Sequence, residues 1–184
     1  MSLNLLIDSG KTVFTTIDLG NILKIGNKNY LLVYINRLKK RGEIKMIKKG
    51  IYVINNNFNV FELANKLRSP SYVSLQSILF KNGIIFQDYS DIITSISYNT
   101  IKINLINKEF RYHKIKSDLL SNPKGIVVEN NVRLATPERA FIDLVYIYND
   151  YHIDNLDKLN KNLLLEIAKD FGDNIFKKIK SYYA

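Results

Sequence analysis

The residues best suited to chemistry are lysines and arginines near the N-terminus. Residues 1–54 contain ten Lys and Arg against three Asp and Glu, which gives a formal charge of 10 − 3 = +7, while the whole chain carries +10. The other 130 residues contribute only 17 − 14 = +3. A positive field concentrated in one small region is typical of a protein that binds a polyanion.

The polar side chains of this region fall into two groups according to the contacts they can make with a nucleic acid. Asparagine suits adenine and lysine suits guanine in the major groove. The candidates for base contacts are Lys28, Asn29 and Asn36. Phosphate contacts give affinity and register rather than sequence information, and the candidates for them are Arg37, Lys39, Lys40, Arg41, Lys45, Lys48 and Lys49.

Short helices are predicted ahead of these residues. Leu3 to Asp8 forms a first helix that ends at Ser9-Gly10. Thr15-Thr16-Ile17-Asp18 then has the pattern of a capping box, in which side chains satisfy the free N–H groups of a helix start. Apolar residues follow this box at helical spacing, namely Leu19, Ile22 and Leu23.

A second helix is predicted to carry the base candidates. Gly26 supplies the turn before it, Asn27 suits its N-cap, and Arg41-Gly42 ends it. One face is apolar, formed by Leu31, Tyr34 or Ile35, and Leu38. The other face therefore carries most of the polar residues.

A lysine-tipped hairpin completes the N-terminal region. Ile44–Ile47 and Ile51–Ile54 are rich in β-branched residues and flank Lys48-Lys49-Gly50. Together with the helices, this predicts a winged helix-turn-helix over residues 1–55, whose second helix enters the major groove of double-stranded DNA. Two other uses of the same surface stay open: docking of an acidic protein partner, and non-specific binding of nucleic acid, including RNA.

The remainder, residues 56–184, predicts an α+β domain. Asn55-Asn56-Asn57 breaks the pattern and marks the boundary. We expect antiparallel strands between helices. The predicted helices are Phe58–Leu67, Ser74–Lys81, one that starts at Thr136-Pro137-Glu138, Leu156–Lys169 and Asp173–Tyr182, and the predicted strands are Ile92–Tyr98, Thr100–Ile106, Phe110–Ile115, Ile126–Glu129 and Val132–Ala135.

Signs of enzyme chemistry are weak. His113 and His152 are the only histidines and there is no cysteine, so no zinc-ligand spacing is present. No glycine-rich phosphate loop occurs either. Glu43-Ile44-Lys45 has the form found in some metal-dependent nucleases but lacks acidic partners. We expect no catalysis, metal or cofactor, and we interpret Arg139 and Asp143 as a structural pair one helical turn apart.

The start of the chain lacks the basic region of a signal peptide, and no apolar run approaches the roughly 20 residues of a membrane span. We therefore expect a cytoplasmic protein without membrane contact.

An ordered set of segments between about Thr12 and Tyr148 resembles the AbiEi-type antitoxins and related transcriptional regulators. A winged helix ending in Lys49-Gly50-Ile51-Tyr52-Val53 comes first. It is followed by Ser71-Tyr72-Val73-Ser74-Leu75-Gln76-Ser77-Ile78-Leu79, Gly83-Ile84, Ile93-Thr94-Ser95-Ile96-Ser97 and Arg133-Leu134-Ala135-Thr136-Pro137-Glu138-Arg139-Ala140-Phe141-Ile142-Asp143-Leu144.

The resemblance implies a role in a type IV toxin–antitoxin, or abortive infection, system. The winged helix would bind repeats in the promoter of its own operon and repress it. The C-terminal domain would act as antitoxin against a nucleotidyltransferase-like toxin encoded beside it, without needing a stable complex with that toxin. The family also includes regulators that have no toxin partner. The resemblance therefore implies DNA binding more directly than it implies toxin neutralisation.

Overall fold

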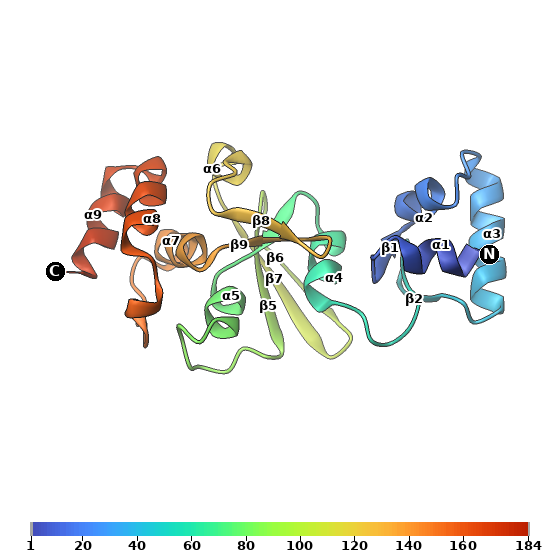
Figure 1. Ribbon diagram of the computed structural model, residues 1–184, viewed down its shortest axis with the longest axis horizontal. Coiled ribbons are helices and arrows are strands. Elements are labelled where there is room, and N and C mark those ends of the chain that lie inside the picture. The colour runs from blue at the N-terminus through green and yellow to red at the C-terminus, as the bar shows by residue number, and fades with distance from the viewer. Residues whose placement is uncertain (1, 184) are drawn as a thin grey trace. The chain divides into compact units, whose positions relative to one another are not determined.

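The structure is a computed structural model that describes residues 2–183, and most of its elements are labelled in Figure 1. The chain is a mixed α+β protein that divides into two compact units. We call them the N-terminal unit, described over residues 2–67, and the C-terminal unit, described over residues 68–183. The division lies after Leu67, whereas the sequence analysis placed the boundary after residue 55.

The N-terminal unit combines helices with a small antiparallel sheet. Within residues 2–67 this sheet has three strands in the order β1-β3-β2. The two helices of the basic region and the hairpin lie where the sequence predicts them, whereas β1 was not expected. The elements are α1 (Ser2–Asp8), β1 (Val13–Thr15), α2 (Thr16–Ile22), α3 (Lys28–Lys40), β2 (Lys45–Lys48), β3 (Ile51–Val53) and α4 (Val60–Leu67).

Caps fix the two helices that follow β1. Thr15 Oγ1 accepts a hydrogen bond from Asp18 N at 3.1 Å, and Thr15 N donates to Asp18 Oδ2 at 2.9 Å, which confirms the capping box. Asn27 Oδ1 accepts from Tyr30 N at 3.0 Å and confirms the predicted N-cap of α3. These helices share one core with α1 and the sheet, which contains Leu6, Phe14, Leu19, Leu31, Ile35, Leu38, Ile44 and Tyr52.

Helix α4 belongs to the N-terminal unit because a buried carboxylate binds it there. Glu62 Oε2 accepts from Thr12 N at 2.8 Å, Thr12 Oγ1 at 2.6 Å and Val13 N at 3.2 Å. Lys66 also pairs with Asp18 at 2.9 Å. These contacts bridge about 50 residues of sequence, which explains why a compositional break at Asn55 is not the structural boundary.

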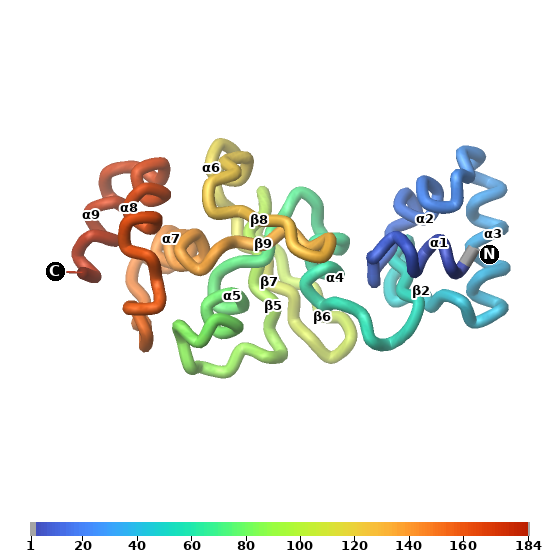
Figure 2. The backbone as a smooth tube through the Cα atoms, viewed as in Figure 1, coloured from blue at the N-terminus to red at the C-terminus, as the bar shows by residue number. Residues whose placement is uncertain are grey.

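The C-terminal unit is built around a larger sheet whose path can be followed in Figure 2. Helices α7, α8 and α9 pack against one another at the C-terminal end of the chain. The elements are β4 (Ser71–Val73), α5 (Gln76–Lys81), β5 (Ile92–Ser97), β6 (Ile101–Leu105), β7 (Lys108–Lys114), α6 (Ser117–Ser121), β8 (Ile126–Glu129), β9 (Val132–Ala135), α7 (Pro137–Tyr148), α8 (Lys161–Ala168) and α9 (Asp173–Ser181).

The expectation of an antiparallel sheet was wrong for two pairings. Within residues 68–183 the strand order is β6-β7-β5-β4-β9-β8, and β5–β7 and β4–β9 run parallel. Strand β7 occupies an inner position of the sheet and β6 forms its edge. This order agrees with burial, because Phe110 and Tyr112 of β7 are buried, whereas Lys102 and Asn104 of β6 are exposed. Charged edge strands also discourage unwanted strand pairing.

Smaller features of this unit test the remaining sequence predictions. Asn130 and Asn131 both have positive φ, 48° and 65°, and form the tight turn that joins the predicted strands β8 and β9. Thr136 caps α7 with Pro137 at its first turn, as predicted. The predicted helix 156–169 is instead divided: a short 3₁₀ turn covers Leu156–Lys158, and Asn160 caps α8 afresh.

Candidate nucleic-acid interface

Helix α3 places a row of residues directly away from the core of its unit. Leu31, Ile35 and Leu38 are buried, which confirms the predicted apolar face. On the opposite side lies an outward row, which we define as Asn29, Val33, Asn36 and Lys40, all of them exposed. The first three members of this row carry no charge.

The three base candidates do not share one face of α3. Asn29 and Asn36 are seven residues apart, about two turns, and belong to the outward row. Lys28 precedes Asn29 by one residue and therefore lies about 100° round the helix from it. Sequence reasoning gave no role to Val33, although its side chain is 49% exposed between the two asparagines.

Cations lie on both flanks of the outward row. Lys28 and Lys39 are on one flank, and Arg37 and Arg41 are on the other, at about 70–110° from the centre of the row. Arg41 pairs with Glu43, which raises the pKa of Arg41 through the hydrogen bond between them. This pairing leaves Arg41 less available to a phosphate than the sequence suggested.

Within residues 2–183 the other side chains predicted to contact DNA form no ion pair. Among the residues that the structure describes, no ion pair involves Lys28, Arg37, Lys39, Lys40, Lys45, Lys48 or Lys49. Lys24, exposed in the turn before α3, is a further cation without an ion pair in the described chain, and sequence reasoning missed it. Lys11, by contrast, is held by Asp18 at 2.6 Å.

The hairpin holds its lysines at the edge of the small sheet. Lys45 and Lys48 belong to the exposed edge strand β2, and the pairing with β3 shifts register between Met46 and Lys48. Gly50 turns the chain with φ +81°, and its carbonyl accepts a hydrogen bond from Thr16 N at 3.1 Å. The hairpin tip is thereby fixed to the start of α2.

Asp18, in α2, forms ion pairs with Lys11 and Lys66 inside the N-terminal unit. Burial raises the pKa of Asp18, but hydrogen bonds from Lys11, the Thr15 backbone and Lys66 outweigh burial and hold that pKa far below its usual value. The carboxylate is therefore ionised throughout the physiological range and neutralises lysines that face inward.

The predicted structural pair of the C-terminal unit is completely buried. Arg139 Nε lies 3.1 Å from Asp143 Oδ1, and Ser74 Oγ donates to Asp143 Oδ2 at 2.7 Å. Burial lowers the pKa of Arg139, but the attraction of Asp143 raises it above its usual value. Arg139 also donates to Tyr72 OH at 2.9 Å. The guanidinium is thus permanently charged and fully surrounded by protein groups.

Backbone carbonyl groups accept the remaining N–H donors of the Arg139 guanidinium. Arg139 Nη2 donates to Leu119 O at 2.7 Å and Nη1 donates to Lys124 O at 2.9 Å. One side chain therefore connects α7 with α6 and with the loop before β8. Because its donors all meet protein acceptors, this cluster is structural and leaves no open position for a ligand.

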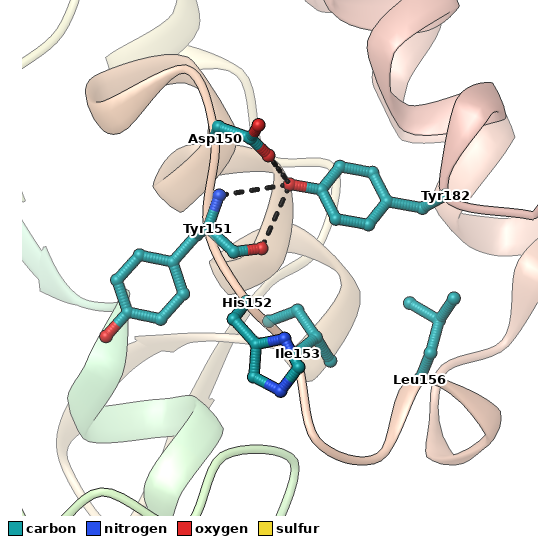
Figure 3. Close-up of a pocket in the computed structure, with 6 residues that line it drawn as sticks. All are labelled: Asp150, Tyr151, His152, Ile153, Leu156 and Tyr182. Carbon is teal, nitrogen blue, oxygen red and sulfur yellow. Dashed lines mark hydrogen bonds between the residues drawn. The ribbon is translucent and has the colours of Figure 1, made fainter.

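A surface pocket of about 560 Å³ lies beside α9 (Figure 3). Tyr182 OH accepts from Tyr151 N at 3.1 Å and lies 3.0 Å from both Asp150 Oδ1 and Tyr151 O. His152 points outward, 86% exposed, with Nε2 3.5 Å from Asp154 Oδ1. The tyrosine hydroxyl is used to attach α9 to the loop after α7.

Within residues 2–183 no three His, Cys, Asp or Glu side chains gather closely enough to hold a metal ion. No helix in that range is both long enough and apolar enough to cross a membrane. Neither protein-family models nor curated proteins give a match to this chain.

Proposed function

We propose that this protein is a DNA-binding transcriptional regulator whose N-terminal unit is a winged helix-turn-helix. The order α1-β1-α2-α3-β2-β3, with the sheet order β1-β3-β2, agrees with that arrangement. Helix α3 is the recognition helix, and the β2–β3 hairpin is the wing. The observation that carries the proposal is the set of cations on α3 and the hairpin that have no acidic partner in the described chain.

The division of labour follows from charge and position. Residues near the N-terminus of a recognition helix meet base edges, which gives Asn29 the first base contact and Asn36 the next on the same face. Lys45, Lys48 and Lys49 contact phosphates from the wing. Each phosphate that is neutralised releases counterions and steepens the salt dependence of binding.

We further propose that the protein represses its own operon and acts as the antitoxin of a type IV system against a nucleotidyltransferase-like toxin. Support comes from the ordered segments that resemble AbiEi-type antitoxins. Arg139 and Asp143, within one of those segments, form the buried cluster described above. That segment therefore stabilises the C-terminal unit, and surface residues elsewhere carry the antitoxin activity.

The first experiment compares binding of the purified protein to the DNA upstream of its own gene with binding to scrambled DNA of equal length. Salt of about 150 mM suppresses weak phosphate-only binding. We expect clear preference for the upstream DNA. Asn29→Ala and Asn36→Ala reduce this preference, whereas Lys48→Ala and Lys49→Ala weaken both complexes alike. Equal or absent binding would refute the regulator and favour docking of an acidic protein on the same surface.

A further inference from the structure

The exposed side chains of α3 from Asn29 to Asn36 are all uncharged, although the region around them is basic. Asn29, Val33 and Asn36 fall within about 60° of one another around the helix axis. None is charged, and none belongs to the core. Lys40 continues the row only at its C-terminal end, beyond the segment that reaches base edges most directly.

These side chains match one kind of base pair. An asparagine amide can bond adenine at both N6 and N7, and an exposed apolar group can contact the C5-methyl of thymine. Guanine is read by Arg or Lys, and cytosine by Asp or Glu. Helix α3 contains no acidic residue, and its cations next to this segment lie on the flanks.

Cationic side chains lie on both sides of these uncharged residues. Lys28 and Lys39 run along one side of the uncharged segment, and Arg37 lies on the other. A helix seated in the major groove has a phosphate backbone on each side, because the groove is about as wide as the helix. This arrangement assigns Lys28 to the phosphate contacts rather than to a base.

From this arrangement we infer that α3 recognises a short A·T core, with Asn29 and Asn36 on adenine and Val33 on a thymine methyl group. The distance from Asn29 to Asn36 along the helix is about 10 Å, which is about three base-pair steps. The inference rests on the proposed DNA binding and names the class of sequence that the binding selects.

The test replaces thymine by uracil, which removes only the C5-methyl group. Upstream DNA is prepared once with thymine and once with uracil, and dissociation constants are measured for both. The wild-type protein should bind thymine DNA about fourfold more tightly, the ratio that corresponds to burial of one methyl-sized group. In Val33→Ala this ratio should fall to about 1. Uracil also changes duplex flexibility, so the change of the ratio between proteins is decisive.

Two matched variants define the controls. Leu32→Ala removes a similarly exposed apolar side chain, 41% against 49%, from the flank, and should keep the wild-type ratio. Lys48→Ala should weaken both complexes while the ratio stays unchanged. Val33, Leu32 and Lys48 are all exposed, so each variant should fold, and thermal unfolding checks this.

An adenine arm tests the asparagines in the same way. DNA with 7-deaza-adenine lacks the N7 acceptor but keeps the N6 amino group, so it should bind the wild type more weakly by about 2- to 12-fold for each adenine contacted, the range for one lost hydrogen bond. Asn36→Ala should lose much of that sensitivity.

The outcomes separate the two levels of the argument. Selective binding with the same thymine-to-uracil ratio in the wild type and Val33→Ala would overturn the thymine contact but leave the regulator intact. A ratio that falls in Leu32→Ala and not in Val33→Ala would overturn the assigned phase of α3. Absence of selective binding to any of these DNAs would refute the regulator itself.

Discussion

At the scale of single residues, Arg139 organises the interior of the C-terminal unit. Its guanidinium bonds to the Asp143 carboxylate, to Tyr72 and to the carbonyls of Leu119 and Lys124. A buried ion pair of this kind stabilises little compared with an apolar core, but removal of one partner leaves a buried charge without compensation.

Asp143→Ala should therefore lower the free energy of unfolding of this unit by about 3–5 kcal/mol. Lys178→Ala is the matched control, since it breaks an ion pair with Asp150, whose side chain is 77% exposed, and surface pairs contribute at most about 1 kcal/mol. Urea unfolding followed by circular dichroism measures both. Similar losses for the two variants would contradict a special role for the buried pair.

Gly125 shows how closely the backbone approaches Arg139. Its φ is +71°, and a Cβ atom there would lie only 2.6 Å from the Arg139 Cβ. Gly42 has a similar φ of +72°, but nothing lies within 4 Å of such an atom. Gly42→Ala should cost about 1–2 kcal/mol, the conformational penalty alone. Gly125→Ala should cost clearly more in thermal unfolding, and equal shifts would show that the contact relaxes freely.

Asp18 makes the N-terminal unit sensitive to acid. The pKa of Asp18 is depressed on folding, so its contribution to stability is fully present above its usual value of 3.8 and is lost as the pH falls below it toward the folded value. Asp18→Asn should be less stable than the wild type at pH 7 and should lose less stability between pH 5 and pH 2. Urea unfolding at several pH values measures this. Parallel pH curves would contradict it.

At the scale of elements, local signals predicted most helices. Thr15, Asn27 and Thr136 each cap a helix as their sequence positions indicate. These predictions succeed because a cap involves groups only two or three residues apart. The base and phosphate candidates were likewise placed on α3 and the hairpin, where they are found.

The missed elements depend on partners distant in sequence. Strands β1 and β4 have three residues each and are defined by pairing with β3, β5 and β9. Helix α6 has five residues, and the carbonyl of Leu119 within it bonds to Arg139. Short segments lack enough periodicity to show their type. The sequence also left open whether Tyr34 or Ile35 faces the core. Ile35 is buried in the structure, and this fixes which residues of α3 point outward.

The hairpin provides a prediction for the element as a whole. If Lys48 and Lys49 each contact one phosphate, the double variant Lys48→Ala/Lys49→Ala should reduce the slope of log binding constant against log salt by about 2, since each contact contributes about 0.9. Lys177→Ala, an exposed cation on α9, should leave the slope unchanged. Titrations at several salt concentrations measure the slopes, and an unchanged slope in the double variant would exclude the wing from the contact.

At the scale of the whole molecule, most of the net positive charge belongs to the N-terminal unit. Residues 1–67 carry 11 − 4 = +7 and residues 68–184 carry 16 − 13 = +3, counted from the sequence. The buried Glu62 shows that the basic unit extends through α4, because its carboxylate accepts the backbone N–H groups of Thr12 and Val13.

A fragment that ends at Leu67 should therefore unfold cooperatively on heating. A fragment that ends at Asn55 should be much less stable, because the Thr12 and Val13 N–H groups lose their acceptor and Asp18 loses Lys66. Circular dichroism melts of both fragments measure the difference. Equal stability would place the functional boundary at the Asn55-Asn56-Asn57 break after all.

If α3 binds DNA as we propose, the uncharged part of its outward row, Asn29, Val33 and Asn36, also has a kinetic consequence. Phosphates repeat identically along any duplex, so a protein held by Lys28, Lys39 and Arg37 alone can slide from one position to the next. Asn29 and Val33 would act only over short distances, when adenine or thymine lies next to them. Salt concentration would then set how far the protein travels in one search, while the ratio of residence times on matching and other sequences would stay nearly constant.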